Sequence, residues 1–177
     1  MQNRRRTDYS ESQLTKLISV NRRFPNQNLM KTLILGVGNL LLKDEGVGIH
    51  AVHALEKEDL PPWVSLMDGG TGGLNLIGWL QDYDRIIMID ATLDDNPPGT
   101  IRLINPRYAS DFPPLMSAHE IGLRDMIEAM NLMDDLPAIS LIVISVANIN
   151  ETGTGLSPEI QAVLPKIIQL VKAGILT

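Results

Sequence analysis

Four side chains that could take part in chemistry lie where predicted strands end or a predicted helix begins. They are Glu45, Asp68, Asp90 and His119. In an open α/β sheet, ligands usually bind in a crevice beyond the carboxyl ends of the strands. A glutamate, an aspartate and a neutral histidine could form an open metal site suited to zinc, nickel or manganese. The positions place these side chains towards one edge of a sheet, but they do not establish that the side chains meet.

Two of the four residues have surroundings that favour a functional role. Asp90 ends the apolar run 85–91, which predicts a central strand buried on both faces. A buried carboxylate needs a partner, so packing alone does not explain it. His119 lies in the first turn of a helix predicted from the capping box of Ser117 and Glu120. The helix dipole there disfavours a charged imidazole, and the neutral form binds metals. A surface histidine beside a helix cap is the alternative.

Asp68 opens a glycine-rich loop, residues 68–73, directly after the predicted strand 64–67. The glycines allow the backbone to approach a ligand closely. The alternative is structural, because an aspartate in this position can also cap the helix that follows.

Glu45 lies in the loop after the first predicted strand. Gly36 and Gly38 begin a dinucleotide-binding fingerprint, but the position of its third glycine holds Leu41. Asp44 and Glu45 would also repel a pyrophosphate. The pattern therefore argues against a nucleotide site and leaves Glu45 as a candidate metal ligand.

His50 and His53 lie three residues apart on the helix predicted over residues 46–58. This spacing can bind a metal. The pair lies beside Glu56 and Lys57, however, on a face whose polarity indicates solvent exposure. We therefore interpret both histidines as surface residues and expect their replacement by alanine to have little effect.

The elements alternate in the order β-α-β-α-β-β-α-β-α. Strands are predicted over residues 33–35, 64–67, 85–91, 100–104 and 139–146, and helices over 46–58, 74–80 and 117–130 and from 158 onwards. This order predicts an α/β fold, a three-layer α/β/α sandwich around a mixed, mostly parallel sheet of about five strands, of the phosphorylase/hydrolase-like type. Strand 100–104 is expected to pair antiparallel with strand 85–91.

Composition limits the possible classes of protein. The chain of 177 residues is 44% hydrophobic, which suits one domain with a full core. The absence of cysteine excludes disulfides, a thiolate nucleophile and cysteine-ligated zinc. The net charge of −6 argues against general nucleic-acid binding, and no apolar run is long enough to span a membrane.

Charge is distributed unevenly along the chain. Residues 1–30 hold six basic and two acidic side chains, a net charge of +4 that leaves −10 for the remainder. This polar segment has little hydrophobic periodicity. We expect residues 1–30 to be a mobile extension, with Met30 as an alternative start, and residues 31–177 to form a single catalytic domain.

Five motifs together resemble the hydrogenase maturation proteases. They are GVGNLLLKDEGVG (36–48), MDGGTGG (67–73), IIMIDA (86–91), SAHEIGL (117–123) and GLSPEI (155–160). Each motif is weak alone, but five in the same order and at similar separations are specific. The resemblance covers residues 31–173, and the first 30 residues have no counterpart in it.

The resemblance implies an endopeptidase that removes the C-terminal extension of a nickel–iron hydrogenase large-subunit precursor after nickel insertion. It assigns metal binding to Glu45, Asp90 and His119, and a role towards the substrate to Asp68. It further implies that nickel arrives with the substrate. Glu45, Asp68 and Asp90 are then the candidate catalytic residues.

Two mechanisms and two rival functions remain open at this point. The metal could polarise the scissile carbonyl or activate water, or it could position the chain while Asp68 or another carboxylate acts as base. The rivals are a non-catalytic nickel-sensing chaperone and a phosphorylase-like enzyme, although the chain's arginines form no phosphate-binding motif. We expect a cytoplasmic monomer whose partner is the precursor, with no nucleic-acid or membrane partner.

Overall fold

Apolar runs rich in isoleucine, leucine and valine form five strands, as the sequence predicts. The computed structural model describes residues 30–105, 125–126, 128–130, 132 and 137–175. The strands are β1 (Thr32–Val37), β2 (Val64–Gly70), β3 (Arg85–Thr92), β4 (Ile101–Ile104) and β5 (Ala138–Ser145). Residues 1–29 of the predicted extension 1–30 lie outside the described residues.

The strands form one mixed sheet in the order β2-β1-β3-β5-β4. β1, β2, β3 and β5 run parallel to one another, and β4 alone runs antiparallel, along the edge of β5. The mostly parallel, five-stranded sheet is therefore confirmed. Every residue of β3 is buried, which agrees with the central position predicted from its apolar run.

The expected pairing of strand 100–104 with β3 is wrong. β4 pairs with β5, where Ile101 lies opposite Ile144. β3 offers no free edge, because β1 occupies one side of it and β5 the other. β4 instead pairs along the edge of β5 that β3 does not occupy.

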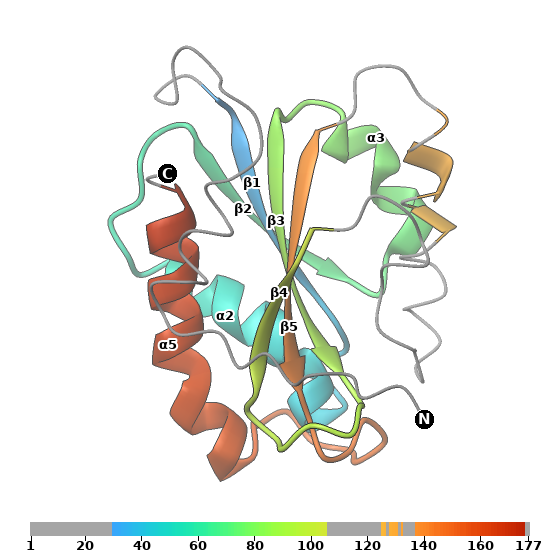
Figure 1. The fold of residues 1–177 in the computed structure, drawn as a ribbon, viewed down its shortest axis with the longest axis vertical. Helices are drawn as coiled ribbons and strands as arrows, with labels where there is room; N and C mark the ends of the chain where they lie inside the picture. Colours follow the sequence, from blue (N-terminus) through green and yellow to red (C-terminus); the bar gives the residue numbers. More distant parts are fainter. Residues whose placement is uncertain (1–29, 106–124, 127, 131, 133–136, 176–177) are drawn as a thin grey trace, which may run out of the picture.

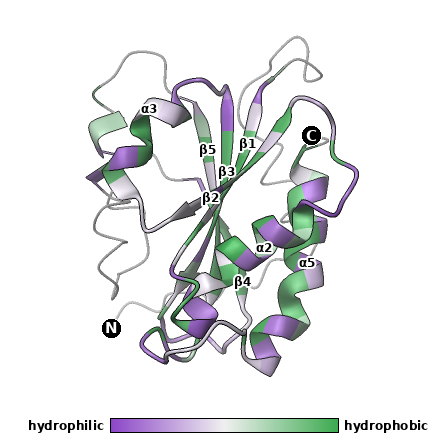
Figure 2. Ribbon diagram, turned by 180° about the vertical axis from the view of Figure 1, so that it is seen from behind, coloured by the Kyte–Doolittle hydropathy of each residue, from purple (hydrophilic) through white to green (hydrophobic). Residues whose placement is uncertain are grey.

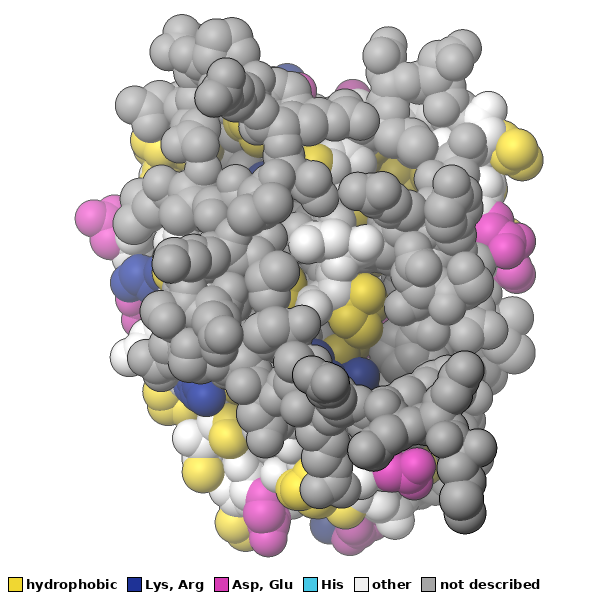
Figure 3. All heavy atoms as spheres, viewed as in Figure 1, with side chains coloured by type: hydrophobic (Ala, Val, Ile, Leu, Met, Phe, Trp, Pro, Cys, Tyr) yellow, Lys and Arg dark blue, Asp and Glu magenta, His cyan; other side chains and the backbone are white. Residues whose placement is uncertain are grey.

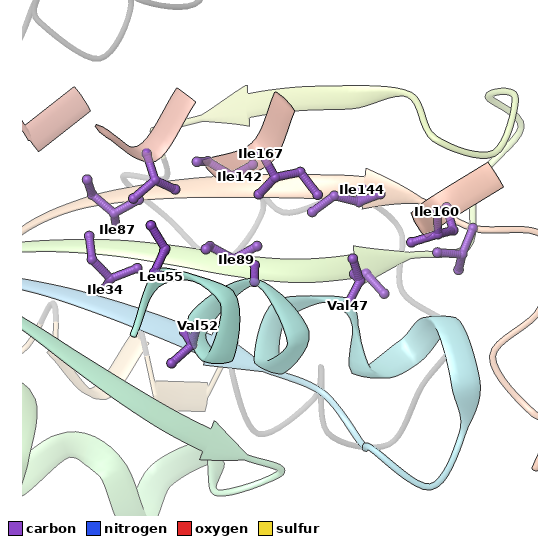
Figure 4. Packing of buried hydrophobic residues seen from close by; sticks show 14 of the residues in the cluster. Ile34, Val47, Val52, Leu55, Ile87, Ile89, Ile142, Ile144, Ile160 and Ile167 are labelled. Atoms are coloured by element: carbon purple, nitrogen blue, oxygen red, sulfur yellow. The ribbon is translucent and has the colours of Figure 1, made fainter. Parts of the chain in front are cut away.

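Helices cover both faces of the sheet, which confirms the three layers (Figure 1). On one face, α2 (Val47–Leu55) and α5 (Pro158–Ile175) pack over a cluster that includes Ile34, Ile87 and Ile142 (Figure 4). On the other face, η3 (Gly73–Leu76) and α3 (Ile77–Leu80) pack with Leu33, Leu35 and Met88. The core is thus divided by the sheet into two apolar layers.

Several elements differ from their predicted bounds. The first helix is shorter than 46–58, because the 3-10 turn η2 (Lys43–Gly46) precedes α2. β2 extends past Met67 to Gly70, and β3 continues to Thr92. Of the helix predicted over 117–130, residues 125–126 and 128–130 are described and helical, whereas its capping box and His119 lie outside the described residues.

Helix α5 is secured at both ends. Ser157 is its N-cap, as the sequence predicts, and its Oγ accepts a hydrogen bond from Ile160 N at 3.4 Å. At the other end, Arg85 Nη1 donates to the carbonyl oxygen of Gly174 at 2.7 Å. Arg85 is buried, and this burial lowers the pKa of its guanidinium from the ordinary value. The arginine thus ties the start of β3 to the C-terminal end of α5.

Replacing Arg85 with alanine should lower the free energy of unfolding by about 1–3 kcal/mol, because it leaves a buried carbonyl without this donor. Urea unfolding followed by circular dichroism would measure the loss. Lys172 lies on α5 and forms an exposed ion pair with Glu58. Lys172→Ala removes this pair and should lower the free energy of unfolding by less than about 1 kcal/mol. Equal losses in the two variants would contradict the role given to Arg85.

Hydropathy follows this layering. Hydrophobic residues concentrate on the strands and on the inner sides of the helices, and hydrophilic ones on the outer sides (Figure 2). On the face seen in Figure 3, the coloured Asp and Glu side chains are scattered, most of them near the outline of the molecule. Within the part of the chain that the structure describes, no helix is long and apolar enough to cross a membrane.

Candidate active site

The strand connections define where a site can form. From β1 the chain passes through α2 to β2, which lies on one side of β1. From β3, on the other side of β1, the chain continues to β4 and β5, which lie farther from β1. The chain therefore leaves β1 and β3 in opposite directions. Such a switch point opens a crevice beyond the carboxyl ends of the two strands. Glu45 follows β1 and Asp90 lies near the end of β3, so both candidates belong to this switch point.

Glu45 is held in a buried position beside β3. It lies in η2, which contacts β3, and only 4% of the residue is exposed. Gly38 allows this approach, because a Cβ at that position would come within 1.9 Å of the Glu45 carbonyl oxygen. Gly38 also has a φ of +134°, which disfavours any residue with a side chain.

The start of α2 brings the two acid-bearing segments together. A Cβ on Gly48 would lie 2.1 Å from the carbonyl oxygen of Ile89 and 2.5 Å from that of Val37. The helix backbone is therefore in direct contact with β3 immediately before Asp90. Gly48 is three residues after Glu45. The contact of Gly48 with β3 therefore holds the η2 segment, which carries Glu45, close to the part of β3 that carries Asp90.

Asp90 is 3% exposed. One of its carboxylate oxygens, Oδ1, accepts a hydrogen bond from Ala91 N at 2.8 Å. Because side chains alternate along a strand, Asp90 shares the sheet face of Ile86 and Met88, opposite α2. His119, the third residue of the predicted metal set, lies outside the described residues.

Asp68 has different surroundings. It lies in register with Gly36 of β1, on the sheet face that α2 covers, and 40% of its side chain is exposed. β1 lies between β2 and β3, so two strand spacings, about 10 Å, separate the backbones of Asp68 and Asp90. Asp68 Oδ1 accepts a hydrogen bond from Gly70 N at 2.9 Å. It does not cap η3, whose N-cap is Gly72.

The histidines of α2 do not act as a pair. His50 Nε2 lies 3.0 Å from the carbonyl oxygen of Thr154, and His53 Nε2 lies 3.7 Å from Asp68 Oδ2. The two imidazoles therefore face different segments, that of His50 the loop containing Thr154 and that of His53 the end of β2. The approach of His53 to Asp68 was not predicted from the sequence. The β1-α2-β2 crossover offers a signal for it, since such a helix lies over the two strands that it connects.

The described residues contain no group of three or more His, Asp or Glu side chains that could hold a metal ion. The predicted set of Glu45, Asp90 and His119 is not tested by this, because His119 lies outside them. What the structure provides is a switch point with two buried carboxylates, and an exposed carboxylate on the opposite sheet face. The buried pair suits binding of a cation, and the exposed acid is accessible to a polypeptide.

Comparisons with known proteins agree on one family. Residues 49–173 match the family model described as hydrogenase maturation protease. The hydrogenase 2 maturation protease of Escherichia coli is 34% identical over 149 residues, which cover 82% of this chain and 91% of the relative. The hydrogenase expression/formation protein HupD of Rhizobium leguminosarum is 32% identical over 143 residues, covering 78% and 71%. The solved structure of the E. coli hydrogenase maturating endopeptidase HybD superposes with a TM-score of 0.74 at 34% identity, covering 80% of this chain and 90% of that one.

Proposed function

Because the chain belongs to the hydrogenase maturation protease family, we propose that it removes the C-terminal extension of a nickel–iron hydrogenase large-subunit precursor after nickel insertion. Its substrate is then a folded precursor that carries its own nickel, and the reaction is hydrolysis of one peptide bond. The observation that carries the proposal is the placement of Glu45 and Asp90, both almost fully buried, at the β1–β3 switch point.

Nickel enters this proposal as part of the substrate. Glu45 and Asp90 supply carboxylate oxygens and His119 an imidazole nitrogen, a donor set that divalent nickel accepts. Burial of the two acids favours this role, because a buried carboxylate gains from a cation that enters beside it. Recognition of nickel through these three residues would restrict cleavage to precursors that already hold the metal.

The exposed Asp68 has a different role in the proposal. Its carboxylate is accessible from solvent and lies on the opposite face of the sheet from Asp90. We assign to it contact with the polypeptide around the scissile bond, either by orienting that bond or by taking a proton from the attacking water. The buried acids would then bind nickel, and the metal would hold the substrate in register with Asp68.

A cleavage assay tests the proposal. Purified protein is mixed with nickel-loaded and nickel-free precursor, and the C-terminal fragment is detected by mass spectrometry. We expect the fragment from the nickel-loaded precursor alone. Binding of the loaded precursor without cleavage would support a nickel-sensing chaperone instead. Equal cleavage of both forms would contradict recognition of nickel.

A further inference from the structure

The backbone at Lys43, two residues before Glu45, has an unfavourable conformation. Lys43 has a φ of +46° and is, among the described residues, the only non-glycine residue with positive φ. A residue with a side chain is disfavoured in this left-handed region and stays there only where its surroundings hold it. The loop that carries Glu45 therefore requires contacts from outside itself.

Those contacts come from residues 151–157, here called the latch segment. Lys43 N donates to Gly153 O at 2.8 Å, and Gly153 N donates to Leu41 O at 2.9 Å, so the two segments form a short parallel bridge. The Lys43 ammonium also pairs with Glu151. This ion pair is partly exposed and contributes little by itself, so the backbone bridge is the stronger restraint.

Asp44 makes the deepest contact with the latch segment. Its Oδ1 accepts a hydrogen bond from Ser157 N at 2.6 Å, and the residue is 7% exposed. Ser157 is the N-cap of α5, so the carboxylate lies at the positive end of an 18-residue helix. Asp44 is thus a buried acid whose partner is identified, and this partner belongs to a helix packed in the core.

We propose that Asp44 is a positioning residue, which fixes Glu45 at the β1–β3 switch point by joining the Glu45 loop to the N-terminus of α5. This inference rests on the proposed function for the role of Glu45. Glu45 follows Asp44 directly in η2, so anchoring one residue limits the positions that the next can reach. Of the two adjacent acids, Asp44 then holds the loop and Glu45 acts on the substrate.

Two pairs of variants test the inference. Asp44→Ala removes the acceptor, whereas Asp44→Asn keeps a side-chain oxygen in the same place. Ser157→Pro removes the donor N–H, whereas Ser157→Ala keeps it and removes only the helix cap. If Asp44→Ala does not fold, the two Ser157 variants test the same hydrogen bond from the side of its donor. Ser157→Ala also controls for a simple loss of stability in α5.

The first measurement is hydrogen exchange of the peptide covering residues 39–46, without substrate. We expect faster exchange in Asp44→Ala and Ser157→Pro, with Asp44→Asn and Ser157→Ala close to the wild type. The second is cleavage of the nickel-loaded precursor, where kcat/KM should fall about 10- to 100-fold in the first two variants and stay near the wild-type value in the others.

Unchanged exchange in Asp44→Ala, or no rescue by Asp44→Asn, would overturn the inference. A loss of activity in Ser157→Ala equal to that in Ser157→Pro would do the same, since it would trace the effect to helix stability. If the wild type itself cleaves no precursor, the proposed function fails. The exchange results then decide the inference by themselves.

Discussion

Replacing Asp90 with asparagine should reduce cleavage of the nickel-loaded precursor by about 100-fold or more, while the protein stays folded. Asparagine keeps the oxygen that accepts the Ala91 N–H, so the local backbone bond can persist. It lacks the negative charge that a nickel ligand provides. Glu45→Gln should act in the same way, because Glu45 is the other buried acid at the switch point.

Stability separates this effect from damage to the fold. Two buried carboxylates in one region disfavour each other's charged forms, so neutral replacements should unfold at the same urea concentration as the wild type or at a higher one. Asp59→Asn and Glu56→Gln make the same chemical changes at exposed positions and should leave cleavage unchanged. Full activity in Asp90→Asn would exclude Asp90 from the site.

Replacing Gly48 with alanine should lower the free energy of unfolding by at least about 3 kcal/mol. The added Cβ would meet the carbonyl oxygens of Ile89 and Val37 at 2.1 and 2.5 Å. Backbone atoms of two central strands cannot move aside as a flexible side chain can. α2 would therefore shift from the sheet and carry η2 with it, so cleavage should also fall in the protein that remains folded.

Gly78→Ala is the matched control. Gly78 lies in α3, and a Cβ there would have no atom within 4 Å. Alanine favours the helix, so this variant should be more stable than the wild type by about 0.5–1 kcal/mol. Urea unfolding of both variants measures the difference. If Gly48→Ala is as stable as Gly78→Ala, the close contact between α2 and β3 is not present in the protein.

Local patterns in the sequence were sufficient to predict the strands and the start of α5. The apolar runs determined the strands because a strand buried on both faces needs an unbroken run of apolar residues, and β3 is the clearest case. Ser157 and Pro158 determined the start of α5 because capping depends on residues adjacent in sequence. The family, too, followed from the sequence, since the order and separation of the motifs lie within it.

The tertiary structure alone decided which of these elements meet. β4 could not pair with β3, because β1 and β5 occupy both edges of β3, and no local pattern contains that information. The register of β2 placed Asp68 on the sheet face opposite Asp90, although both acids follow similar apolar runs. Likewise Asp44 and Ser157 lie 113 residues apart, and their hydrogen bond exists only because α5 returns to the loop after β1. Such contacts depend on how the whole chain packs. Residue types and spacing therefore identified the candidate acidic residues but could not predict which residues they contact.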